Sequence, residues 1–546
     1  MPSHRIRTDH SDGSILSRST LRCVCVAALL LAGVGLVGPA YAQTADDALR
    51  FSERLPGSGA RSVGMSGVGI AGVADVGALY TNPAGLGYLR QSQVVGSFHV
   101  LSVQDDARYE PAALEGQEPS ISTNLQTVTD YGLGNAGLAY KIPTRRGALV
   151  LAGGISQTAT FERTLDYTGE SRANSITDTF LPFVGNYQVG SGGSLAFDFD
   201  TPRRAFEAGA IEFIQERFDN GEYPFIQAVA PTTLVQQSDE VIEEGRLTEA
   251  NFGGAVEAAQ GVMAGASLNI SFGTYRFSRL YQEVDILNEN TPDLYEVAVD
   301  GGFVRGFDQL DVRETITSDL VGVNFRVGLA ADLNSAVRAG VVIESPTWYS
   351  VDETFGTRVT TFFDEGASLS AGQTGANEFD YSVRSPWRIG GGAQLELGSL
   401  RVMGDLEFVD WTQLRLTADG IRFDEASERI RDFKPVVNSR FGAEYRFDAL
   451  TVRGGFAYQP DPRDVEIQLP DGETTDRSQT YYSAGFSYRF DAQFRVDFGW
   501  SQQQFDDQYR PYSSVTVAGE NVDIVAPYVD EDITRNRFLL GVSYFF

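Results

Sequence analysis

The last twelve residues of the chain, Arg535 to Phe546, read RNRFLLGVSYFF and alternate regularly between two kinds of side chain. Successive side chains of a strand point to opposite faces, so one face would carry Phe538, Leu540, Val542, Tyr544 and Phe546. Bacterial outer-membrane barrels end on such a strand, with its apolar face toward lipid. We therefore expect the barrel-assembly machinery to read this strand through Phe546. A soluble β-sandwich can also end on an amphipathic strand, so the rest of the chain must decide between the two.

The N-terminal region has the pattern of a secretory signal peptide. Four arginines precede an apolar run at 23–37, and Pro39-Ala40-Tyr41-Ala42 supplies an A-x-A cleavage site. The run is shorter than the roughly 20 residues that a membrane-spanning helix needs, so we predict that residues 1–42 are a signal peptide. Both cysteines, Cys23 and Cys25, lie inside it, which excludes disulfides and thiolate metal sites from the mature chain.

The chain is strongly acidic, with a formal net charge of −30. This charge argues against nucleic acid as a partner, because phosphates require a cationic surface. Aromatic residues make up 11% of the chain, which argues against disorder. Two interpretations remain, namely acidic outer loops that bind divalent ions or adaptation to high salt, and we favour the second.

Beyond Gln93 the chain alternates between amphipathic segments and polar breaks, and we predict fourteen strands, an even number as in single-chain bacterial barrels. The predicted strands are 93–103, 131–142, 147–167, 260–272, 275–288, 309–331, 335–355, 378–398, 400–418, 436–447, 449–460, 478–490, 492–505 and 535–546. The fold class is therefore all-β, a 14-stranded antiparallel transmembrane barrel over residues 93–546.

The breaks between these strands alternate strictly between short and long. The short breaks are Thr144 to Arg146, Gly273-Thr274, Asp332 to Asn334, Ser399, Asp448 and Asp491. This alternation places both termini and all tight turns in the periplasm and the long loops outside the cell, whereas a soluble sandwich has no reason to segregate its loops by length. The chain is thus predicted to be a multi-pass barrel of the bacterial outer membrane, exported through the periplasm, in contact with outer-membrane lipid and monomeric.

The predicted outer loop at 168–259 is the longest and carries a helical pattern. Thr201-Pro202 resembles a helix start, and an apolar stripe that includes Phe206 and Phe213 follows with helical spacing up to Asn220-Gly221. We also expect shorter helices at 232–244 and 248–259. The stripe could rest over the barrel mouth or pack only on neighbouring loops.

Residues 43–92 are rich in glycine and alanine and lack strand patterning. The sequence Gly67-Val68-Gly69-Ile70-Ala71-Gly72 formally matches GxGxxG, but the nucleotide-binding motif needs a preceding strand and a following helix, and neither is predicted. Small residues allow close approach of backbones, so we predict a compact plug inside the barrel.

This segment resembles the N-terminal hatch of FadL-type outer-membrane transporters (the OMPP1/FadL/TodX family). The resemblance is carried by Gly64, Ala74-Asp75 and Asn82-Pro83-Ala84, and further along by Pro386 to Gly390, Asp405 to Trp411, Arg453 to Tyr458 and Tyr482 to Gly485. It implies a fourteen-stranded barrel with a hatch at 43–92, gating residues Gly64, Asp75, Asn82, Pro83 and Ala84, and lateral release through a gap in the wall. The hatch has Ala74-Asp75 where paired aspartates are common in the family, which leaves ligand identity open.

Strand parity predicts which charged residues face the lumen, among them Arg326, Arg388 and Arg440. Such an arginine could hold a ligand carboxylate with two hydrogen bonds, and Phe206 and Phe213 could contact an apolar ligand. The alternative is that these arginines pair with lumenal acids and only fill a polar interior.

The sequence gives little support to an enzyme. His99 is the only histidine after the predicted signal peptide, and no Gly-x-Ser-x-Gly motif accompanies it. Asp530-Glu531-Asp532 lacks the spacing of a calcium loop. We expect no catalytic residues, no metal and no cofactor.

The sequence and the resemblance together predict passive transport of hydrophobic small molecules, with long-chain fatty acids as the first expectation. The alternative is a hatch-bearing barrel that binds exported proteins as a shuttle or anchor for a secretion system. A general diffusion porin is a third possibility, and it would show steady ion conductance.

Overall fold

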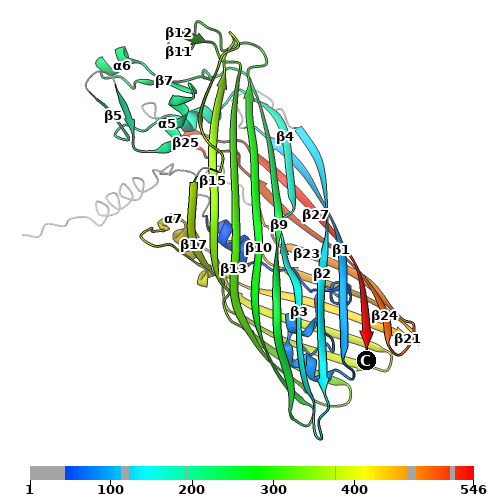
Figure 1. Cartoon of the computed structure of the whole chain (residues 1–546). Coiled ribbons are helices and arrows are strands. Elements are labelled where there is room, and N and C mark those ends of the chain that lie inside the picture. Colours follow the sequence, from blue (N-terminus) through cyan, green and yellow to red (C-terminus); the bar gives the residue numbers. More distant parts are fainter. Residues whose placement is uncertain are drawn as a thin grey trace, which may run out of the picture. The chain divides into compact units, whose positions relative to one another are not determined.

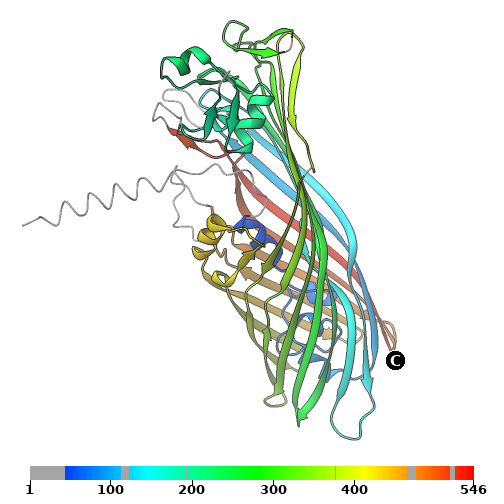
Figure 2. The ribbon, with the colours of Figure 1, turned by 60° about the vertical axis from the view of Figure 1, so that its left-hand side comes forward.

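The computed structural model describes residues 44–546 except 112–121, 191–193, 300, 376, 464–474 and 517–522. The predicted signal peptide lies outside these residues and stays a prediction. The described chain forms a closed antiparallel barrel of fourteen strands (Figures 1 and 2), as the sequence predicts.

The wall contains straight strands and strands interrupted once. The straight strands are β1 (Gln93–Glu110), β2 (Ser122–Ile142), β9 (Val235–Ala259), β10 (Val262–Val284), β13 (Gln309–Asp332), β21 (Pro435–Phe447), β22 (Leu450–Gln459), β23 (Gln479–Arg489), β24 (Phe494–Tyr509) and β27 (Tyr528–Phe545). The interrupted strands are β3 with β4 (Leu149–Thr160, Arg163–Ser171), β14 with β15 (Val337–Glu344, Trp348–Phe362), β17 with β18 (Asn377–Arg384, Arg388–Leu397) and β19 with β20 (Leu400–Asp410, Arg415–Thr417).

The remaining elements lie in the N-terminal segment and in the loops. The N-terminal segment holds α2 (Ala45–Ser52), α3 (Ala60–Val63), α4 (Ala78–Thr81) and η1 (Pro83–Tyr88). The loops hold η2 (Ile176–Phe180), β5 (Tyr187–Val189), β6 (Leu195–Phe197), α5 (Asp200–Glu207), β7 (Ile211–Phe213), α6 (Gln215–Asp219), β8 (Phe225–Gln227), β11 (Glu296–Val299), β12 (Gly302–Arg305), β16 (Ser368–Gly372), η3 (Trp411–Gln413), α7 (Asp424–Arg431), β25 (Val515–Thr516) and β26 (Asp523–Ile524). In the described residues no helix is both long and apolar enough to span a bilayer.

The first and last strands close the barrel. β1 pairs with β2 on one side and with β27 on the other, from Gln93 opposite Phe545 to Glu110 opposite Tyr528. The amide of Phe546 donates a hydrogen bond to the carbonyl of Ser92 over 3.0 Å. The alternate residues from Phe538 to Phe546 are 39–57% exposed, whereas Leu539 and Ser543 are buried, so the predicted outward face of the terminal strand is confirmed.

The number of strands is predicted correctly, but two predicted helices and one predicted turn are wrong. The short helices predicted at 232–244 and 248–259 are instead β9, a single strand of 25 residues. The turn predicted at Gly273-Thr274 is absent, because β10 runs unbroken from Val262 to Val284 and pairs with β9 along its length. The inward face of β9 is polar, with buried Gln237, Asp239, Glu249 and Asn251, so it lacks the apolar alternation that identifies most strands.

The long outer loop is therefore 172–234 rather than 168–259, and its predicted helix is broken. α5 ends at Glu207 and α6 covers Gln215–Asp219, with β7 between them. Gly209 has φ +67°, a left-handed conformation that ends a helix, and the amide of Ala210 donates to the carbonyl of Ala205 over 2.8 Å.

Two of the interrupted strands contain proline at the break. Pro346 separates β14 from β15, and Pro386 separates β17 from β18. Proline has no N–H to donate to a strand ladder, so these breaks follow directly from the sequence. Both halves remain in the wall, because β13 pairs first with β15 and then with β14.

The inner face of the wall is polar and the outer face is apolar. On β13, Val321, Val323 and Phe325 are 41–59% exposed toward the lipid side, while Asn324 and Arg326 are 1% exposed inside. A shift of register by one residue would turn Arg326 into lipid, at about 2–4 kcal/mol for an arginine at mid-bilayer. The sequence therefore fixes the register strongly.

The 172–234 loop covers part of the barrel mouth. Its buried side chains pack with Tyr281 of β10, with Leu310 and Val312 of β13 and with Val359 of β15, which all face inward. The same cluster contains Tyr295, Val297 and Phe307 of the neighbouring outer loop after β10, so the 172–234 loop packs both on these strands and on a neighbouring loop.

We expect docking of this loop to weaken as the pH rises. Burial raises the pKa of Asp178 to about 6 and the pKa of Glu212 to about 7, above the ordinary values of about 4. The carboxyl groups of Asp178 and Glu212 therefore bind their protons more tightly in the docked loop than in the free loop. Protonation stabilises docking fully below about pH 4, and this stabilisation is lost as the pH rises through 6 to 7. Hydrogen exchange of residues 172–234, corrected for intrinsic rates, should be slower at pH 5 than at pH 8. The variant Asp178→Asn with Glu212→Gln should lose most of this difference, and equal protection of the wild-type loop at both pH values would contradict the prediction.

Candidate functional site

The N-terminal segment runs through the lumen and contacts strands all around the wall. α3 packs on β23, β24 and β27, while η1 packs on β3, β9, β10 and β13; Figure 1 shows these helices in blue behind the strands. The amide of Leu55 also donates to the carbonyl of Thr158 on β3 over 2.8 Å. A segment of under 50 residues thus touches both halves of the barrel.

Inward-facing glycines of the wall make this close contact possible. At each of five wall positions an added Cβ would lie within 2.5 Å of an atom of the N-terminal segment, too close for any side chain. These positions are Gly265 of β10, Gly328 of β13, Gly340 of β14, Gly455 of β22 and Gly499 of β24. We call these five residues the glycine collar. None of the five is among the predicted site residues, although glycine at inward positions of many strands is a signal for close backbone contact.

Asn82, Pro83 and Ala84 join the N-terminal segment to β10, β13 and β14. The Asn82 side chain is fully buried; its amide nitrogen donates to the carbonyl of Ile70 over 2.7 Å and to those of Leu329 and Val341 over 3.2 and 3.3 Å. Its Oδ1 accepts from the amide of Ala84 over 3.1 Å, which caps η1, and Pro83 takes the first helical position. Ala84 packs on Met263 and Ala330.

Gly64 and Asp75 also lie at contacts of the segment. Gly64 lies against β22 and β23, where an added Cβ would be 3.2 Å from Arg453 Cδ and from Gly485 Cα. Asp75 accepts from Arg61 over 3.0 Å and from the Gly77 amide over 2.8 Å. Gly64, Asn82, Pro83 and Ala84 therefore lie against the wall, whereas these two hydrogen bonds of Asp75 stay within the segment. The part of all five residues in gating stays a prediction.

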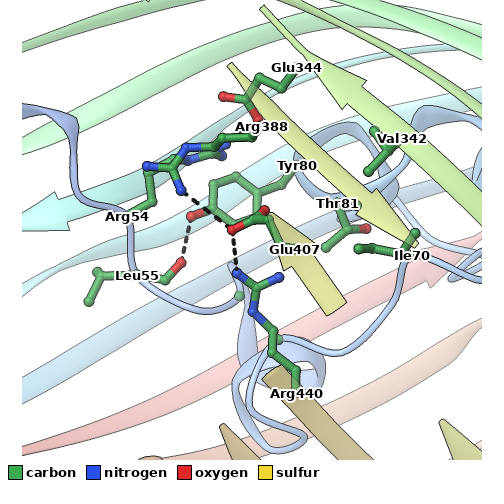
Figure 3. A pocket seen from close by; sticks show the side chains of 13 residues that line it. Arg54, Leu55, Ile70, Tyr80, Thr81, Val342, Glu344, Arg388, Glu407 and Arg440 are labelled. Atoms are coloured by element: carbon green, nitrogen blue, oxygen red, sulfur yellow. Dashed lines mark hydrogen bonds and ion pairs between the residues drawn. The ribbon is translucent and has the colours of Figure 1, made fainter. Parts of the chain in front are cut away.

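Arg326, Arg388 and Arg440 lie near one another around the middle of the segment, as Figure 3 shows for Arg388 and Arg440. Arg326 Nε donates to Glu344 over 2.7 Å, and Arg326 Nη1 lies 2.8 Å from Glu249. Arg388 and Arg440 share Glu407 at 3.4 and 3.0 Å. All three arginines therefore pair with glutamates of the wall, and their part in ligand binding stays a prediction.

Two of these arginines also donate to backbone carbonyls of the N-terminal segment. Arg388 Nη2 donates to the carbonyl of Ser52 over 2.6 Å, and Arg326 Nη1 donates to that of Leu79 over 3.0 Å. Arg54 of the segment pairs with Glu344 of the wall. These contacts hold the segment to the wall electrostatically, in addition to the packing at the glycine collar.

The space between segment and wall is small. The cavity in Figure 3 has a volume of about 30 Å³, and a second cavity beside α3, lined in part by Arg61 and Asp497, has about 40 Å³. Each has room for a few water molecules and neither has room for a hydrophobic solute. In this conformation the N-terminal segment thus leaves no passage for such a solute at either of these two cavities.

Phe206 and Phe213 lie away from the lumenal arginines. Phe206 packs on Phe197 with ring centroids 5.6 Å apart, and Phe213 packs on Phe225 at 5.4 Å. Both belong to the apolar core of the 172–234 loop. The structure thus does not bring the predicted aromatic and arginine residues into one site.

The wall is incomplete between β2 and its neighbour β3. Backbone pairing runs from Ile142 opposite Leu149 to Asn135 opposite Ser156, and no further pair of these strands is found in the described chain. β3 breaks after Thr160, and β4 pairs with β9 instead. A gap in the ladder therefore opens beside residues 122–134 of β2.

Side chains bridge this gap. Arg246 of β9 donates to Asp130 over 2.9 Å, and Gln126 donates to Asp166 of β4 over 3.1 Å. His99 is fully buried, and its Nε2 lies 3.5 Å from Asp130. His99, the only histidine after residue 42, thus lies next to the gap.

Nothing in the described structure indicates a metal site. Among the residues described, no group of three or more His, Cys, Asp or Glu side chains is placed to hold a metal ion. In the acidic triplet at 530–532, Glu531 is buried and its Oε2 accepts a hydrogen bond from Arg163 Nε over 3.0 Å. Successive residues of a strand face opposite ways, so the side chain of Glu531 points away from those of Asp530 and Asp532.

Comparisons with known proteins agree with this architecture. A family model described as outer membrane protein transport protein (OMPP1/FadL/TodX) matches residues 250–543, more than half of the chain. A 47 kDa outer membrane protein of Pasteurella multocida (strain Pm70) is 25% identical over 217 residues, which cover 36% of this chain and 48% of that protein. The match thus spans about half the length of this curated relative.

Solved structures with the same architecture have low sequence identity. A Pseudomonas aeruginosa FadL homologue has a TM-score of 0.50 at 11% identity and covers 90% of this chain and 99% of its own. The Pseudomonas putida toluene transporter TodX has a TM-score of 0.48 at 14% identity with the same coverage. At such identities the likeness concerns the fold and leaves the substrate open.

Proposed function

The chain belongs to the OMPP1/FadL/TodX family of outer membrane transport proteins, and we propose that this channel for hydrophobic molecules carries long-chain fatty acids, with the N-terminal segment as its gate. The family consists of transport channels of the bacterial outer membrane and not of enzymes. Transport of hydrophobic molecules follows from membership, whereas the fatty-acid substrate and the gate are our proposal.

The observation that carries the proposal is the fit of the N-terminal segment to the wall. Three kinds of contact hold residues 44–92 across the lumen. They are backbone packing at the glycine collar, hydrogen bonds from Asn82 and hydrogen bonds from lumenal arginines such as Arg388. The two cavities described beside the segment each hold only a few water molecules, so we infer that a solute passes these points only if the segment moves. We infer that this segment acts as the hatch.

The gap beside β2 is the proposed exit. A hydrophobic solute that leaves through the wall enters the lipid directly and avoids the aqueous periplasm. Exposure to water there would raise its free energy by about 25 cal/mol per Å² of apolar surface. The contact between Arg246 and Asp130 would have to open for this step. No energy source is needed, since the solute moves from water to an apolar phase.

The ends of the chain fit the same proposal. We propose that residues 1–42 direct export and are removed, and that the barrel-assembly machinery recognises the terminal strand through Phe546. The protein is proposed to function as a monomer, because one chain closes the barrel by pairing β1 with β27.

A disulfide between hatch and wall should block transport. The hydroxyl oxygens of Ser66 and Ser483 lie 2.8 Å apart in the buried contact between hatch and β23, and the mature chain has no cysteine of its own. The double variant Ser66→Cys, Ser483→Cys should take up labelled oleate as the wild type does when reduced and should lose most uptake when oxidised.

The two single-cysteine variants are the matched controls and should respond to neither oxidant nor reductant. Formation of the bond is checked by mass spectrometry of the intact protein. Full uptake by a protein in which the disulfide is formed would show that the hatch does not gate transport.

A further inference from the structure

Two exposed arginines face each other on the outside of the barrel wall. Arg384 ends β17 and Arg415 begins β20, and the register of these two strands places the two residues directly opposite each other. Both side chains are exposed, whereas their strand neighbours Val383 and Leu416 are buried inside. The labels of β17 and α7 in Figure 1 mark this place on the barrel. We call Arg384 and Arg415 the arginine pair.

Backbone carbonyl groups gather the two guanidinium groups at one point. Arg415 Nη1 donates to the carbonyls of Thr412 and Leu414 over 2.6 Å each. Arg384 Nη2 donates to the carbonyl of Gln413 over 3.4 Å. Three consecutive carbonyl groups thus hold both cations side by side. In the part of the chain that the structure describes, neither guanidinium forms an ion pair with a carboxylate.

Such a pair of cations calls for an anion. Like charges directly opposite each other on two strands destabilise a sheet. The chain has 73 acidic and 43 basic residues, so a shortage of carboxylates does not explain why these two cations lack one. A phosphate group fits them, because it accepts parallel hydrogen bonds from the planar fork of an arginine and carries enough charge for two. The wall therefore leaves a place for an anion from outside the protein.

The arginine pair lies at the outer boundary of the lipid-facing band. Arg384 is opposite Trp348 of β15, and Trp348 is opposite Val323 of β13. Trp348 and Val323 are 47 and 41% exposed, and Trp387, which follows β17, is 42% exposed. Tryptophan is enriched where a membrane meets water. This end of the barrel carries the long loops, so the arginine pair lies at the level of the headgroups of the outer leaflet.

The surfaces on both sides of the arginine pair suit a lipid with a charged headgroup. Toward the membrane, Ile389 of β18 and Phe408 of β19 are opposite each other and half exposed, so acyl chains can lie on them. Away from the membrane, Asp319, Asp352 and Asp380 are opposite one another on β13, β15 and β17 and are exposed. These carboxylates repel a phosphate, so the charges of the wall place an anionic headgroup at the arginine pair.

We propose that the arginine pair binds the phosphate of a lipid in the outer leaflet, and that the acyl chains of this lipid lie on Trp387, Ile389 and Phe408. Basic clusters at a membrane surface bind anionic headgroups in this way, and the outer leaflet of a bacterial outer membrane contains glycolipid that carries phosphate. The inference goes beyond the proposed function. It concerns a lipid held on the outside of the wall, and it holds whichever solute the barrel transports.

Titration of the full-length purified protein with diphosphoryl lipid A tests the site. The protein is freed of bound lipid in detergent, and the bound molecules are counted by native mass spectrometry. The double variant Arg384→Gln, Arg415→Gln should raise the Kd of one bound lipid by about ten-fold or more, because hydrogen bonds to a charged group are lost. Lipid A from which both phosphates have been removed should bind the wild type and this variant equally weakly.

A second pair of opposed arginines provides the matched control. Arg313 of β13 and Arg358 of β15 are opposite each other and exposed, but they lie well beyond Val321, at the outer edge of the lipid-facing band. The double variant Arg313→Gln, Arg358→Gln removes the same charge and should leave the Kd unchanged. Equal Kd values for the two double variants would overturn the proposal. Inorganic phosphate that binds the wild type as tightly as lipid A does would overturn it too, because the partner would then not be a lipid.

Discussion

Replacement of Gly328 by valine is expected to convert the closed barrel into an ion-conducting pore. A Cβ at this position would lie 1.9 Å from Asn82 Oδ1 and 2.8 Å from Asn82 Cγ. The Asn82 side chain cannot retreat, because it is fully buried and bonded to carbonyls of both segment and wall. Valine suits a strand, so we expect the wall to persist and the hatch to detach.

Planar-bilayer recording measures the effect. The wild type should show little steady conductance, and Gly328→Val should raise it on the order of ten-fold or more, because an unplugged barrel of this size encloses a water-filled channel. Gly391→Val is the matched control, since Gly391 on β18 has no atom within 4 Å of an added Cβ. If Gly328→Val stays as silent as Gly391→Val, the hatch does not depend on the glycine collar. Steady conductance of the wild type would instead indicate a diffusion porin.

Arg326→Met should destabilise the folded barrel by about 3–5 kcal/mol, the range for removal of one partner of a buried ion pair. Arg326 is 1% exposed and pairs with Glu249 and Glu344. Methionine keeps much of the side-chain length but leaves two buried carboxylates with one cation fewer. The same substitution removes the hydrogen bond to Leu79, so hatch docking should weaken as well.

The loss is measured by urea unfolding in lipid vesicles, followed by tryptophan fluorescence. Arg313→Met on the same strand is the control, since Arg313 is exposed and its loss should shift the free energy of unfolding by under about 1 kcal/mol. Adding Glu249→Gln to Arg326→Met should restore part of the stability. A shift for Arg326→Met no larger than that for Arg313→Met would show that the pairing with Glu249 and Glu344 contributes little.

The wall could be predicted from sequence wherever its inner and outer faces differ in polarity. In β13 the apolar residues at every second position from Val321 to Leu329 alternate with the residues between them. This alternation predicted both the strand and the inward position of Arg326. The method was wrong at β9, where Gln237, Asp239 and Glu243 face the lumen and Glu240 and Glu244 face outward beyond the membrane. With polar residues on both faces the period of two carries no hydrophobic signal. The false turn at Gly273 compensated for the missed strand, so the count of fourteen was right with two errors inside it.

The site could be predicted only in part, because it depends on contacts between distant segments. Parity placed Arg388 and Arg440 inside, but nothing local showed that both would share Glu407. The family resemblance identified Asn82 as a site residue. It did not identify the hydrogen-bond partners of Asn82, Leu329 and Val341, which lie about 250 residues away in the sequence. Phe206 and Phe213 share a helical spacing, but the helix breaks at Gly209 and the two rings join a loop core. Helix α2 gave no sign of its position, since its apolar face matches any apolar surface.

The closed seam between β1 and β27 has a consequence for biogenesis. Gly541 of β27 and Gly499 of β24 lie against Ala60 of α3, so the strand synthesised last seals the cylinder directly over a segment synthesised nearly five hundred residues earlier. A finished cylinder offers that segment no wide entrance, so insertion must precede sealing. We therefore expect the N-terminal residues to enter the barrel before β27 pairs with β1, so that the protein leaves the assembly pathway with its lumen already closed.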